Sequence, residues 1–451
     1  MKGIEVIMIR MSENFPSLIK YMGSKTEIIP FLEYGINDIH RENQPICDLF
    51  AGSATLAGAL RGQCELISND IQQYSQVLAK AYLSNYTWET YPSIDDLINE
   101  AELRYTRFNE FFPEYNNRFN YNRGFTLEEF NEIEVEQRAL LENQRFQEFD
   151  DYYIFVKNYS GTYWSYDQCI WIDSIKYVAD RYKEDNVELY TAIMASLMYS
   201  MAYNSQSTGH YAQYRDASNI KSMEDILIYR RKSIREYFIR KFEELTTIND
   251  HNNYRYDVLS LGYLECLNTL QPGTLVYADP PYCFVHYSRF YHAIETLVRY
   301  DYPSVKYKGR YREDRHQSPF CISTQVGNAF DDMFRIIRER ELELVLSYSN
   351  SNTNTIDLDN LLYRAYVELN NIVQAEQQEL VKTSVRELIN TINNSEETEQ
   401  YQSYTLTYQN AIDNYYNIEV KLADHTHSTM GRKDDRVRQV KEVLIVARKA
   451  D

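Results

Sequence analysis

The sequence predicts an α/β protein with a mostly parallel β-sheet, helices on the faces of the sheet and a large helical insertion. Short apolar runs typical of buried strands lie at residues 45–50, 64–70, 274–282, 342–350, 416–423 and 440–448. Helical patterns such as ATLAGALRG separate the first of these runs, and this alternation favours a parallel sheet. In such a sheet a ligand binds at the carboxyl ends of the strands.

Two long helical stretches interrupt the alternation. The first is polar and contains the helical patterns TLEEFNEIEVEQRALLENQ and VELYTAIMASLMYSMAY, and the second covers 355–392 and leads into the loop-like NNSEETEQ. We therefore expect one discontinuous main domain with a helical insertion and a helical excursion. The expected ranges are 15–83 and 250–451 for the main domain, 84–249 for the insertion and 355–400 for the excursion.

The composition is that of a globular protein with an acidic surface. The chain has 451 residues, of which 44% are hydrophobic and 25% charged, and its formal net charge is −19. Single cores usually stop growing near ~250–300 residues, so a chain of this length is expected to add insertions to its main domain. Nonspecific affinity for nucleic acid comes largely from Lys and Arg, so a nucleic-acid site must be a local basic cleft.

The cysteines and the apolar runs bear on compartment and metal content. Six cysteines are scattered without a CxxC motif or Cys/His metal spacing, which predicts a reduced compartment and no metal site. No apolar run approaches ~18 residues, and the short N-terminal run is broken by Arg10. We expect a cytoplasmic protein without a membrane span or signal peptide.

A small-residue turn and an acid follow the first two predicted strands. The turn DLFAGSAT (48–55) between a strand and a helix lets a ligand approach the backbone and the helix amides. Asp70 ends the second strand about 20 residues later, where its two acceptor oxygens suit the hydroxyls of a ribose. The alternative for Asp70 is an N-cap of the next helix. Together the two features favour a nucleoside cofactor.

The stretch YADPPYCF (277–284) ends a buried strand with a carboxylate, two prolines and an aromatic ring. Asp279 and the carbonyl of Pro280 can accept both hydrogens of one exocyclic amino group, which leaves the nitrogen lone pair directed outward. The prolines fix the backbone, and Tyr282 offers a ring on which a planar base can stack. The alternative is a tight turn after a strand, but this tetrapeptide arises rarely by chance.

These motifs occur in a known order. KYMGSK (20–25), DLFAGSAT, the Asn69-Asp70 pair, DPPY and the closing run VKEVLIVAR follow one another along nearly the whole chain. In this set the chain resembles the S-adenosylmethionine-dependent DNA N6-adenine methyltransferases of the Dam-like (D12) class, alpha-type. The resemblance implies a Rossmann-like class I methyltransferase sheet of seven strands, S-adenosyl-L-methionine as cofactor, and double-stranded DNA whose target base is flipped out.

The resemblance also implies a role for each matched residue. The N-terminal motif would contact the methionine end of the cofactor, the turn would lie beneath it, Asp70 would hold the ribose, and the Asp-Val pair in the strand of YRYDVLSL would contact the adenine. The implied cofactor-binding residues are Tyr21, Gly23, Lys25, Ala51, Gly52, Ser53, Asp70, Asp257 and Val258. The residues implied to hold the flipped base are Asp279, Pro280, Pro281 and Tyr282. Ala54 stands where many members have a second glycine, and Tyr21 where some have tryptophan.

The chemistry implied by these positions needs no metal and no strong nucleophile. A sulfonium already activates its methyl group, so the protein mainly aligns a nitrogen lone pair with the methyl–sulfur bond and excludes water. Asp279 is better described as an acceptor that polarises the amine than as a strong base.

Local basic segments are the candidates for contact with DNA. RRKSIREYFIRK (230–241), KYKGRYREDRH (306–316) and GRKDDRVRQVK (431–441) are rich in Lys and Arg, and TGHYAQYR (208–215) reads as a loop that reaches DNA. The candidate DNA-binding residues are His210, Tyr211, Arg230, Arg231, Lys308, Arg310 and Arg312. The insertion at 84–249 is expected to be the target-recognition region.

Three alternatives to an adenine-specific enzyme stay open. N4-cytosine methylation uses the same kind of exocyclic amine, although the motif order and the aspartate before Pro-Pro favour adenine. A methyltransferase-like DNA-binding protein without turnover would not need DPPY and KYMGSK. A bifunctional restriction enzyme would need a nuclease segment, which the sequence does not offer convincingly. We expect a stand-alone methyltransferase, either solitary or paired with a separate restriction endonuclease.

Overall fold

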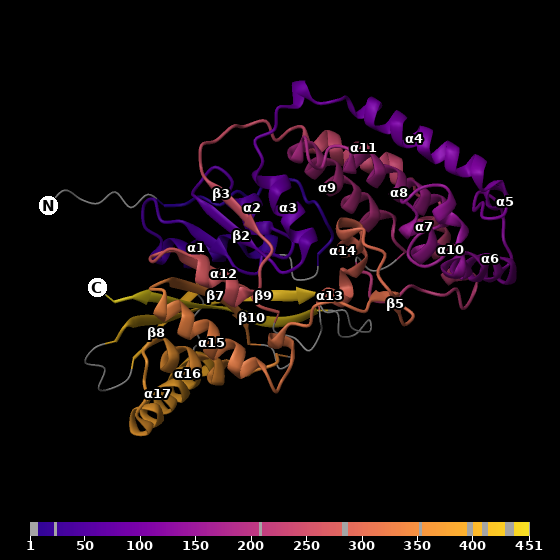
Figure 1. The fold of residues 1–451 in the computed structure, drawn as a ribbon. Coiled ribbons are helices and arrows are strands. Elements are labelled where there is room, and N and C mark those ends of the chain that lie inside the picture. The colour runs from indigo at the N-terminus through magenta and orange to yellow at the C-terminus, as the bar shows by residue number, and fades with distance from the viewer. Residues whose placement is uncertain are drawn as a thin grey trace.

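The sheet is built around five parallel strands. The computed structural model describes residues 8–21, 25–206, 210–281, 287–350, 354–394, 400–407, 414–428 and 437–450, with the backbone alone at 425–428 and 437–440. In this part of the chain eight strands form one sheet in the order β3-β2-β1-β4-β7-β10-β9-β8 (Figure 1). They are β1 (Ile46–Asp48), β2 (Leu66–Asn69), β3 (Tyr256–Leu259), β4 (Leu275–Ala278), β7 (Glu343–Ser349), β8 (Tyr401–Leu406), β9 (Tyr416–Ser428) and β10 (Val437–Lys449).

The strand directions confirm the predicted fold class. The neighbouring strands β3, β2, β1, β4 and β7 run parallel to one another. β10 is antiparallel to both β7 and β9. The eighth strand, β8, was not expected, and it pairs antiparallel with β9 at the edge of the sheet. Its sequence YQSYTL is mostly polar, with Gln402 and Leu406 buried, so it lacks the apolar run that marks the other strands.

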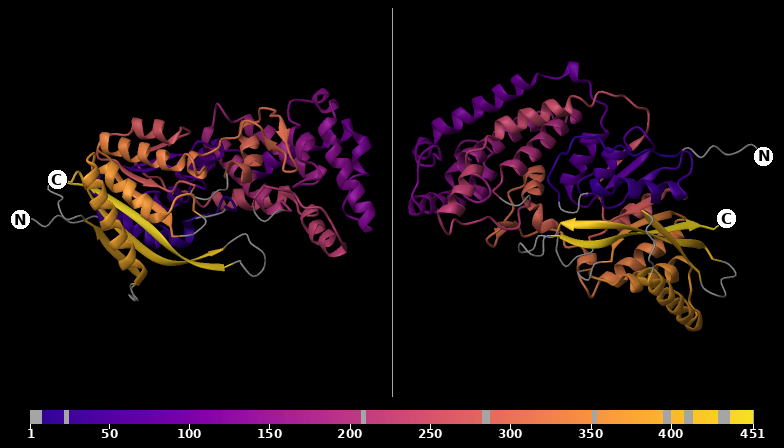
Figure 2. Two further views of the ribbon diagram at one scale, coloured as in Figure 1. Left: turned by 90° about the horizontal axis from the view of Figure 1, so that it is seen from below. Right: turned by 180° about the vertical axis from the view of Figure 1, so that it is seen from behind.

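The two faces of the sheet carry separate hydrophobic cores. Along β4, Leu275 and Tyr277 belong to one core while Val276 belongs to the other, as the alternation of side chains along a strand requires. One face is covered by α1 (Ile29–Ile39), α2 (Thr55–Leu60) and α3 (Gln73–Leu83). The opposite face is covered by α12 (Tyr263–Thr269), α15 (Val326–Glu339), α16 (Leu358–Leu369) and α17 (Ala375–Asn394). Figure 2 shows the indigo and the orange helices on opposite sides of the yellow strands.

A helical segment at 94–245 extends from the α3 side of the sheet (Figures 1 and 2). It comprises α4 (Ile94–Phe111), α5 (Pro113–Asn116), α6 (Leu127–Ala139), α7 (Ile154–Tyr159), α8 (Tyr166–Asp180), α9 (Val187–Asn204), α10 (Ile220–Arg230) and α11 (Ile234–Leu245). Several of these helices begin at side-chain caps, including reciprocal capping boxes at Ser93, Thr126 and Ser165. The segment falls within the expected insertion, whose assignment as a separate domain stays a prediction.

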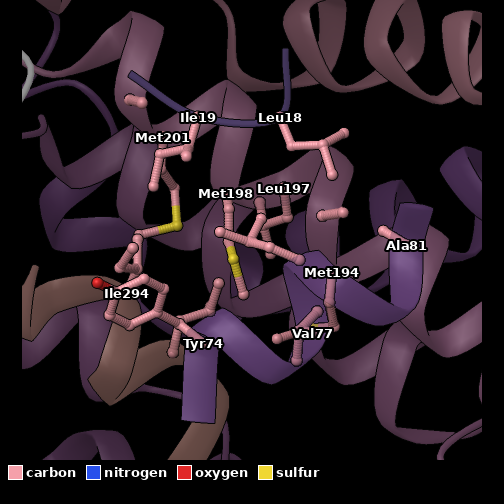
Figure 3. Packing of buried hydrophobic residues seen from close by; sticks show 14 of the residues in the cluster. Leu18, Ile19, Tyr74, Val77, Ala81, Met194, Leu197, Met198, Met201 and Ile294 are labelled. Carbon is pink, nitrogen blue, oxygen red and sulfur yellow. The ribbon is translucent and has the colours of Figure 1, made fainter. Parts of the chain in front are cut away.

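The core of the helical segment is continuous with the core of the sheet. Helix α9 is apolar on all sides and buried along most of its length, which is typical of a central helix. Figure 3 shows Met194 and Met198 of α9 near Val77 and Tyr74 of α3, while Leu18 and Ile19 from the N-terminal stretch lie across the same helix. Helix α9 therefore holds α3 and the N-terminal stretch together.

Shorter elements complete the described chain between β4 and β7 and at the helix connections. These are α13 (Tyr287–Phe290), α14 (His292–Arg299), the antiparallel pair β5 (Val305–Lys306) and β6 (Tyr311–Arg312), and the 3-10 turns η1 (Lys25–Ile28), η2 (Trp88–Thr90), η3 (Leu140–Glu142), η4 (Arg145–Glu148) and η5 (Pro319–Cys321).

Truncation of a side chain at the α3–α9 interface tests whether the two parts unfold together. Met198 is 0% exposed, so Met198→Ala is expected to lower the free energy of unfolding by about 2–4 kcal/mol through the cavity it leaves. Trp164 and Trp171 lie in the helical segment and Trp88 packs on Phe242 of α11, so tryptophan fluorescence reports on this segment, whereas far-ultraviolet circular dichroism reports on the whole chain. Both signals should shift together in urea, and the exposed Met8→Ala serves as control. A shift of the fluorescence transition alone would contradict a shared core.

Candidate active site

A cavity of about 410 Å³ lies at the carboxyl ends of β1, β2 and β4. Its wall comes from the turn after β1, the end of β2, the stretch after β3 and the residues after β4, with further side chains from the N-terminal stretch and α13. The volume falls in the range of ~300–1,000 Å³ that is usual for small-molecule sites. The position is the one that the parallel sheet predicts for a ligand.

Asp70 fixes the floor of the cavity. Its Oδ2 accepts a hydrogen bond of 2.9 Å from the amide of Gly52, and its Oδ1 accepts one of 2.9 Å from the amide of Gln72. Burial raises the pKa of Asp70 above its ordinary value, and these two hydrogen bonds oppose the rise. Asp70 thus ties the turn after β1 to the start of α3, while α3 itself has Gln72 as its N-cap. Each carboxylate oxygen keeps a lone pair for a ligand.

The turn after β1 depends on backbone conformations with positive φ. Gly52 has φ +52°, and a Cβ atom there would lie 2.9 Å from the hydroxyl of Tyr21, so glycine is required at this position. Ala54 also adopts the left-handed region, with φ 58°, where glycine would sit without strain. Ala51 and Ser53 line the cavity beside Gly52. The turn predicted from the sequence therefore lies directly against the cavity.

Two residues that the sequence analysis did not single out as ligands support the site. The side-chain amide of Asn69 donates to the carbonyls of Leu49 at 3.1 Å and Leu261 at 3.2 Å, and its oxygen accepts from the amide of Leu261 at 3.0 Å. Asn69 therefore locks together the chain segments that follow β1, β2 and β3. Its burial at the end of a strand, in place of an apolar residue, is the signal that could have identified it.

Asp48 is the second of these residues. It ends β1, lines the cavity and is 2% exposed, and its Oδ1 has no hydrogen-bond partner among the described residues. Burial raises the pKa of Asp48 well above its ordinary value, and the charges of Asp279 and Asp70 raise it further. A carboxyl group in this setting is suited to a cationic or hydrogen-donating ligand. An acid inside the strand-like run PICDLF was the available signal.

The acid of the DPP turn forms an ion pair with the N-terminal motif. Lys25 Nζ lies 3.1 Å from Asp279 Oδ1 and 3.3 Å from Ser347 Oγ on β7. Burial alone would lower the pKa of Lys25, but the charges of Asp279 and Glu442 outweigh it and raise that pKa above its ordinary value. Lys25 therefore remains a cation inside the cavity. The structure brings it to Asp279, whereas the resemblance implied contact with the cofactor.

An aromatic stack lines the cavity beside this pair. The ring of Tyr21 stacks on Tyr291, with ring centroids 4.5 Å apart, and on Tyr287, with ring centroids 6.1 Å apart. Tyr287 lines the cavity on the chain segment that leaves the DPP turn. Pro280 and Pro281 also line the cavity. The structure thus brings Tyr21, Lys25, the turn, Asp70 and the prolines of the motif to one space.

Some of the predicted site residues lie elsewhere. Asp257 and Val258 are inside β3 rather than at its carboxyl end, and neither lines the cavity. Asp257 instead pairs with Arg255 at 2.9 Å. The stretch 261–265, which follows β3, takes their place in the wall. Gly23 and Tyr282 lie outside the described residues.

Two of the predicted DNA-binding arginines form buried ion pairs inside the protein. Arg230 is 4% exposed and pairs with Glu134 at 2.7 Å. Arg312 is 1% exposed and pairs with Asp301 at 2.6 Å and with Asp314 at 3.0 Å. These guanidinium groups are buried and already have carboxylate partners, so the structure does not support the prediction that they bind phosphate.

Arg310 and the remaining candidates show a similar pattern. Arg310 is 8% exposed and donates to the backbone carbonyls of Asn158 and Arg138. Arg231 is exposed and donates to the carbonyls of Tyr121 and Arg123, and Lys308 pairs with Asp216. His210 is 9% exposed and Tyr211 is 1% exposed, so neither forms an open loop surface. The third basic patch lies mostly outside the described residues.

The geometry defines the class of protein. A parallel sheet with a small-ligand cavity at its carboxyl edge, walled by a glycine turn and an acid at the end of the second strand, is a Rossmann-like α/β enzyme site. The chain matches the family described as D12 class N6 adenine-specific DNA methyltransferase over residues 21–361, and it belongs to that family. The resemblance seen in the sequence is thereby confirmed.

Two curated relatives extend this comparison. The chain is 22% identical over 326 residues to the Modification methylase LlaI of Lactococcus lactis subsp. lactis, which covers 71% of this chain and 44% of that protein. It is also 22% identical over 329 residues to the Type II methyltransferase M.FokI of Planomicrobium okeanokoites, which covers 70% of this chain and 42% of that protein. The chain thus spans less than half the length of each relative.

The described residues include neither a membrane-spanning helix nor a cluster of metal ligands. None of the helices described here is both long and apolar enough to cross a bilayer. Within the same residues, no group of three or more His, Cys, Asp and Glu side chains is arranged to hold a metal ion.

A double-mutant cycle tests the ion pair in the cavity. Lys25→Met is expected to lower the free energy of unfolding by about 3 kcal/mol, because it removes the cation that is paired with the mostly buried Asp279 carboxylate. Adding Asp279→Asn should restore part of that loss, since the charge is then removed with its partner. Urea titrations of the four proteins measure the coupling. Lys382→Met, which breaks an exposed pair with Glu379, is the matched control, and strictly additive effects would argue against the pair.

Proposed function

We propose that this protein transfers a methyl group from S-adenosyl-L-methionine to the N6 amino group of adenine in a short, specific sequence of double-stranded DNA. The observation that carries the proposal is that residues suited to the cofactor and residues suited to the target base line the same cavity. Asp70 and Asp48 lie at the ends of β2 and β1, and Asp279 with Pro280 follows β4, which pairs with β1. A cofactor and a planar base could therefore lie in contact.

The acids at the ends of β1 and β2, together with the glycine turn, suit S-adenosylmethionine. Asp48 offers a buried oxygen that has no partner among the described residues, and the cofactor carries an ammonium group that can supply one. Asp70 keeps acceptor capacity for ribose hydroxyls, and the glycine turn permits close approach to the backbone. When bound, the cofactor supplies an activated methyl group on its sulfonium. The protein contributes position and exclusion of water.

Asp279 and Pro280, which follow β4, suit an exocyclic amine. Lys25 Nζ lies 3.1 Å from one oxygen of Asp279, and a carboxylate oxygen acts only as a hydrogen-bond acceptor. Asp279 and the carbonyl of Pro280 can then each accept one N–H of the target amine. This arrangement fixes the direction of the nitrogen lone pair and polarises the amine without full deprotonation. A base inside duplex DNA reaches such a pocket only when it is flipped out of the helix.

The role in the cell is part of the proposal. The names of the two relatives, a modification methylase and a type II methyltransferase, support a protective modification of DNA. We propose that the chain acts either alone or beside a separate restriction endonuclease, with the helical segment at 94–245 contributing to recognition of the target sequence.

Replacement of Asp279 tests the reaction. Asp279→Asn exchanges an acceptor for a donor and is expected to lower methyl transfer by about 100-fold or more while cofactor binding stays within a few fold. The measurement is transfer of labelled methyl from S-adenosylmethionine to duplex DNA, followed by digestion to nucleosides. The wild-type protein should yield N6-methyladenine. Recovery of N4-methylcytosine alone would refute adenine specificity, and DNA binding without any transfer would support a protein without turnover.

A pair of acid-to-amide changes tests the cofactor site. Asp70→Asn is expected to weaken binding of S-adenosylmethionine by about 10- to 100-fold, because hydrogen bonds to a charged group contribute about 1.5–3 kcal/mol. Asp257→Asn, in β3 and outside the cavity wall, should leave the affinity unchanged. Isothermal titration calorimetry measures both. The reverse outcome would restore the role that the resemblance implied for Asp257.

A further inference from the structure

A group of cations and tyrosine rings gathers where α9, α11 and the N-terminal stretch meet. Its cations come from three separate parts of the chain, and its rings lie on α9, α10 and α11. The group, here named the cationic junction, consists of Lys20, Lys232, Arg240 and Lys241 with Tyr199, Tyr203, Tyr229 and Tyr237. The site described above uses none of these residues.

Cations and rings alternate in space on the α9 side of the junction. Lys20 Nζ lies 4.1 Å from the centroid of the Tyr203 ring, and Lys241 Nζ lies 4.1 Å from the centroid of the Tyr199 ring. The centroids of these two rings are 4.3 Å apart. Arg240 donates a hydrogen bond of 2.8 Å to the hydroxyl of Tyr199. The rings attract the cations electrostatically and so hold them close together.

The α11 side has the same construction. Lys232 Nζ lies 4.5 Å from the Tyr229 centroid and 5.6 Å from the Tyr237 centroid. The guanidinium carbon of Arg240 lies 4.5 Å from the Tyr237 centroid, and Tyr237 stacks on Tyr203 with centroids 6.2 Å apart. One continuous array of rings therefore connects all four cations.

The junction is short of counter-charge. Within the described chain, Lys241 pairs with Glu244 at 2.5 Å, while no carboxylate of a described residue lies within ion-pair distance of Lys20, Lys232 or Arg240. Burial lowers the pKa of Lys20 and the charge of Lys232 lowers it further; the pKa of Lys232 is lowered by burial and then by Arg240. The cations therefore repel one another. This contrasts with the rest of an acidic chain, where Arg230 and Arg312 are matched with acids.

One member of the junction also has a structural role. Lys232 Nζ donates a hydrogen bond of 3.0 Å to the carbonyl of Tyr203, in the last turn of α9, where a cation is favoured by the helix dipole. An ammonium group has three donors, so this bond leaves two. Lys20 and Arg240 are exposed and make no hydrogen bond to a helix end in the described chain. Within this part of the chain, helix capping therefore uses only one of the three donors of Lys232 and none of those of Lys20 or Arg240.

The junction lies next to the cavity. Lys20 directly precedes Tyr21, which lines the cavity and stacks on Tyr287. Leu18 and Ile19, which precede Lys20, are buried against α9, as Figure 3 shows. The backbone of Lys20 is therefore held by Ile19 before it and Tyr21 after it. The junction therefore forms a charged margin between the helical segment and the mouth of the site.

We propose that the cationic junction binds the phosphate backbone of the substrate DNA beside the flipped base. The inference rests on the proposed function, since the duplex must lie across the cavity mouth when a base enters. Phosphates would supply counter-charges for Lys20, Lys232 and Arg240, which have no carboxylate partner among the described residues, and the tyrosine rings hold these cations in place. Contacts of this kind position the duplex without reading its sequence.

The test is the salt dependence of DNA binding. The triple variant Lys20→Gln, Lys232→Gln and Arg240→Gln should reduce the slope of log K against log salt by about 0.9 for each lost phosphate contact, or about 2–3 in total. Fluorescence anisotropy of labelled duplexes should show the same fold loss for substrate and random sequences. The control variant Arg118→Gln and Arg145→Gln removes two exposed arginines that are paired with Glu136 and Glu114, and should keep the wild-type slope.

Further measurements separate the possible failures. An unchanged salt slope in the triple variant, or a loss confined to one DNA sequence, overturns the proposal. If the triple variant has a lowered melting temperature, Lys20→Glu alters one exposed side chain and should still reduce the slope and the affinity, whereas Lys20→Arg should preserve both. Methyl transfer distinguishes the two proposals: a raised KM for DNA with unchanged kcat supports the junction, whereas wild-type protein that shows the salt slope but makes no methylated base refutes only the proposed function.

Discussion

The ion pair between Lys25 and Asp279 is the contact on which the arrangement of the site depends. It joins Lys25, which precedes α1, to Asp279, which follows β4. Neither residue lies in a strand of the sheet. Lys25 also reaches Ser347 on β7, so one ammonium group connects three parts of the fold. Without a cation at this position, Asp279 would face the acids at Asp48 and Asp70 in a mostly buried space. The pair thus permits three carboxyl groups to share one cavity.

In the same cavity, neighbouring strands of the parallel sheet contribute acids with different surroundings. β1 and β4 are paired with Asp48 opposite Tyr277, so the acid that ends β1 and the turn that follows β4 emerge side by side. Asp70, which follows β2, is anchored to the backbone amides of Gly52 and Gln72 and keeps a lone pair on each oxygen. Asp48 is less satisfied and is suited to meet a ligand. Neighbouring strand ends therefore present acids that differ in how far the protein itself satisfies their hydrogen bonds.

Much of this site could be predicted from the sequence because its motifs act locally. The glycine turn, the acid after β2 and the DPP turn each follow a strand, and a parallel sheet brings strand ends together. The partner of Lys25 could not be predicted, because a contact between residues so distant in the chain depends on the tertiary fold. The burial of Arg312 was also missed, although Asp301 and Asp314 lie close by in the sequence and offered a signal. A basic run indicates surface charge only where nearby acids do not already neutralise it.

The burial of α9 limits how the helical segment could be exchanged between relatives. Because α9 packs on α3 and under Leu18 and Ile19, the helical segment is not an appendage that could be exchanged at its two connections. A chimaera that took residues 94–245 from a relative would have to bring a matching outer face of α3 and a matching N-terminal stretch. Under the proposed role of the segment in recognition, new specificity would arise more readily through substitutions on its surface than through replacement of the whole segment.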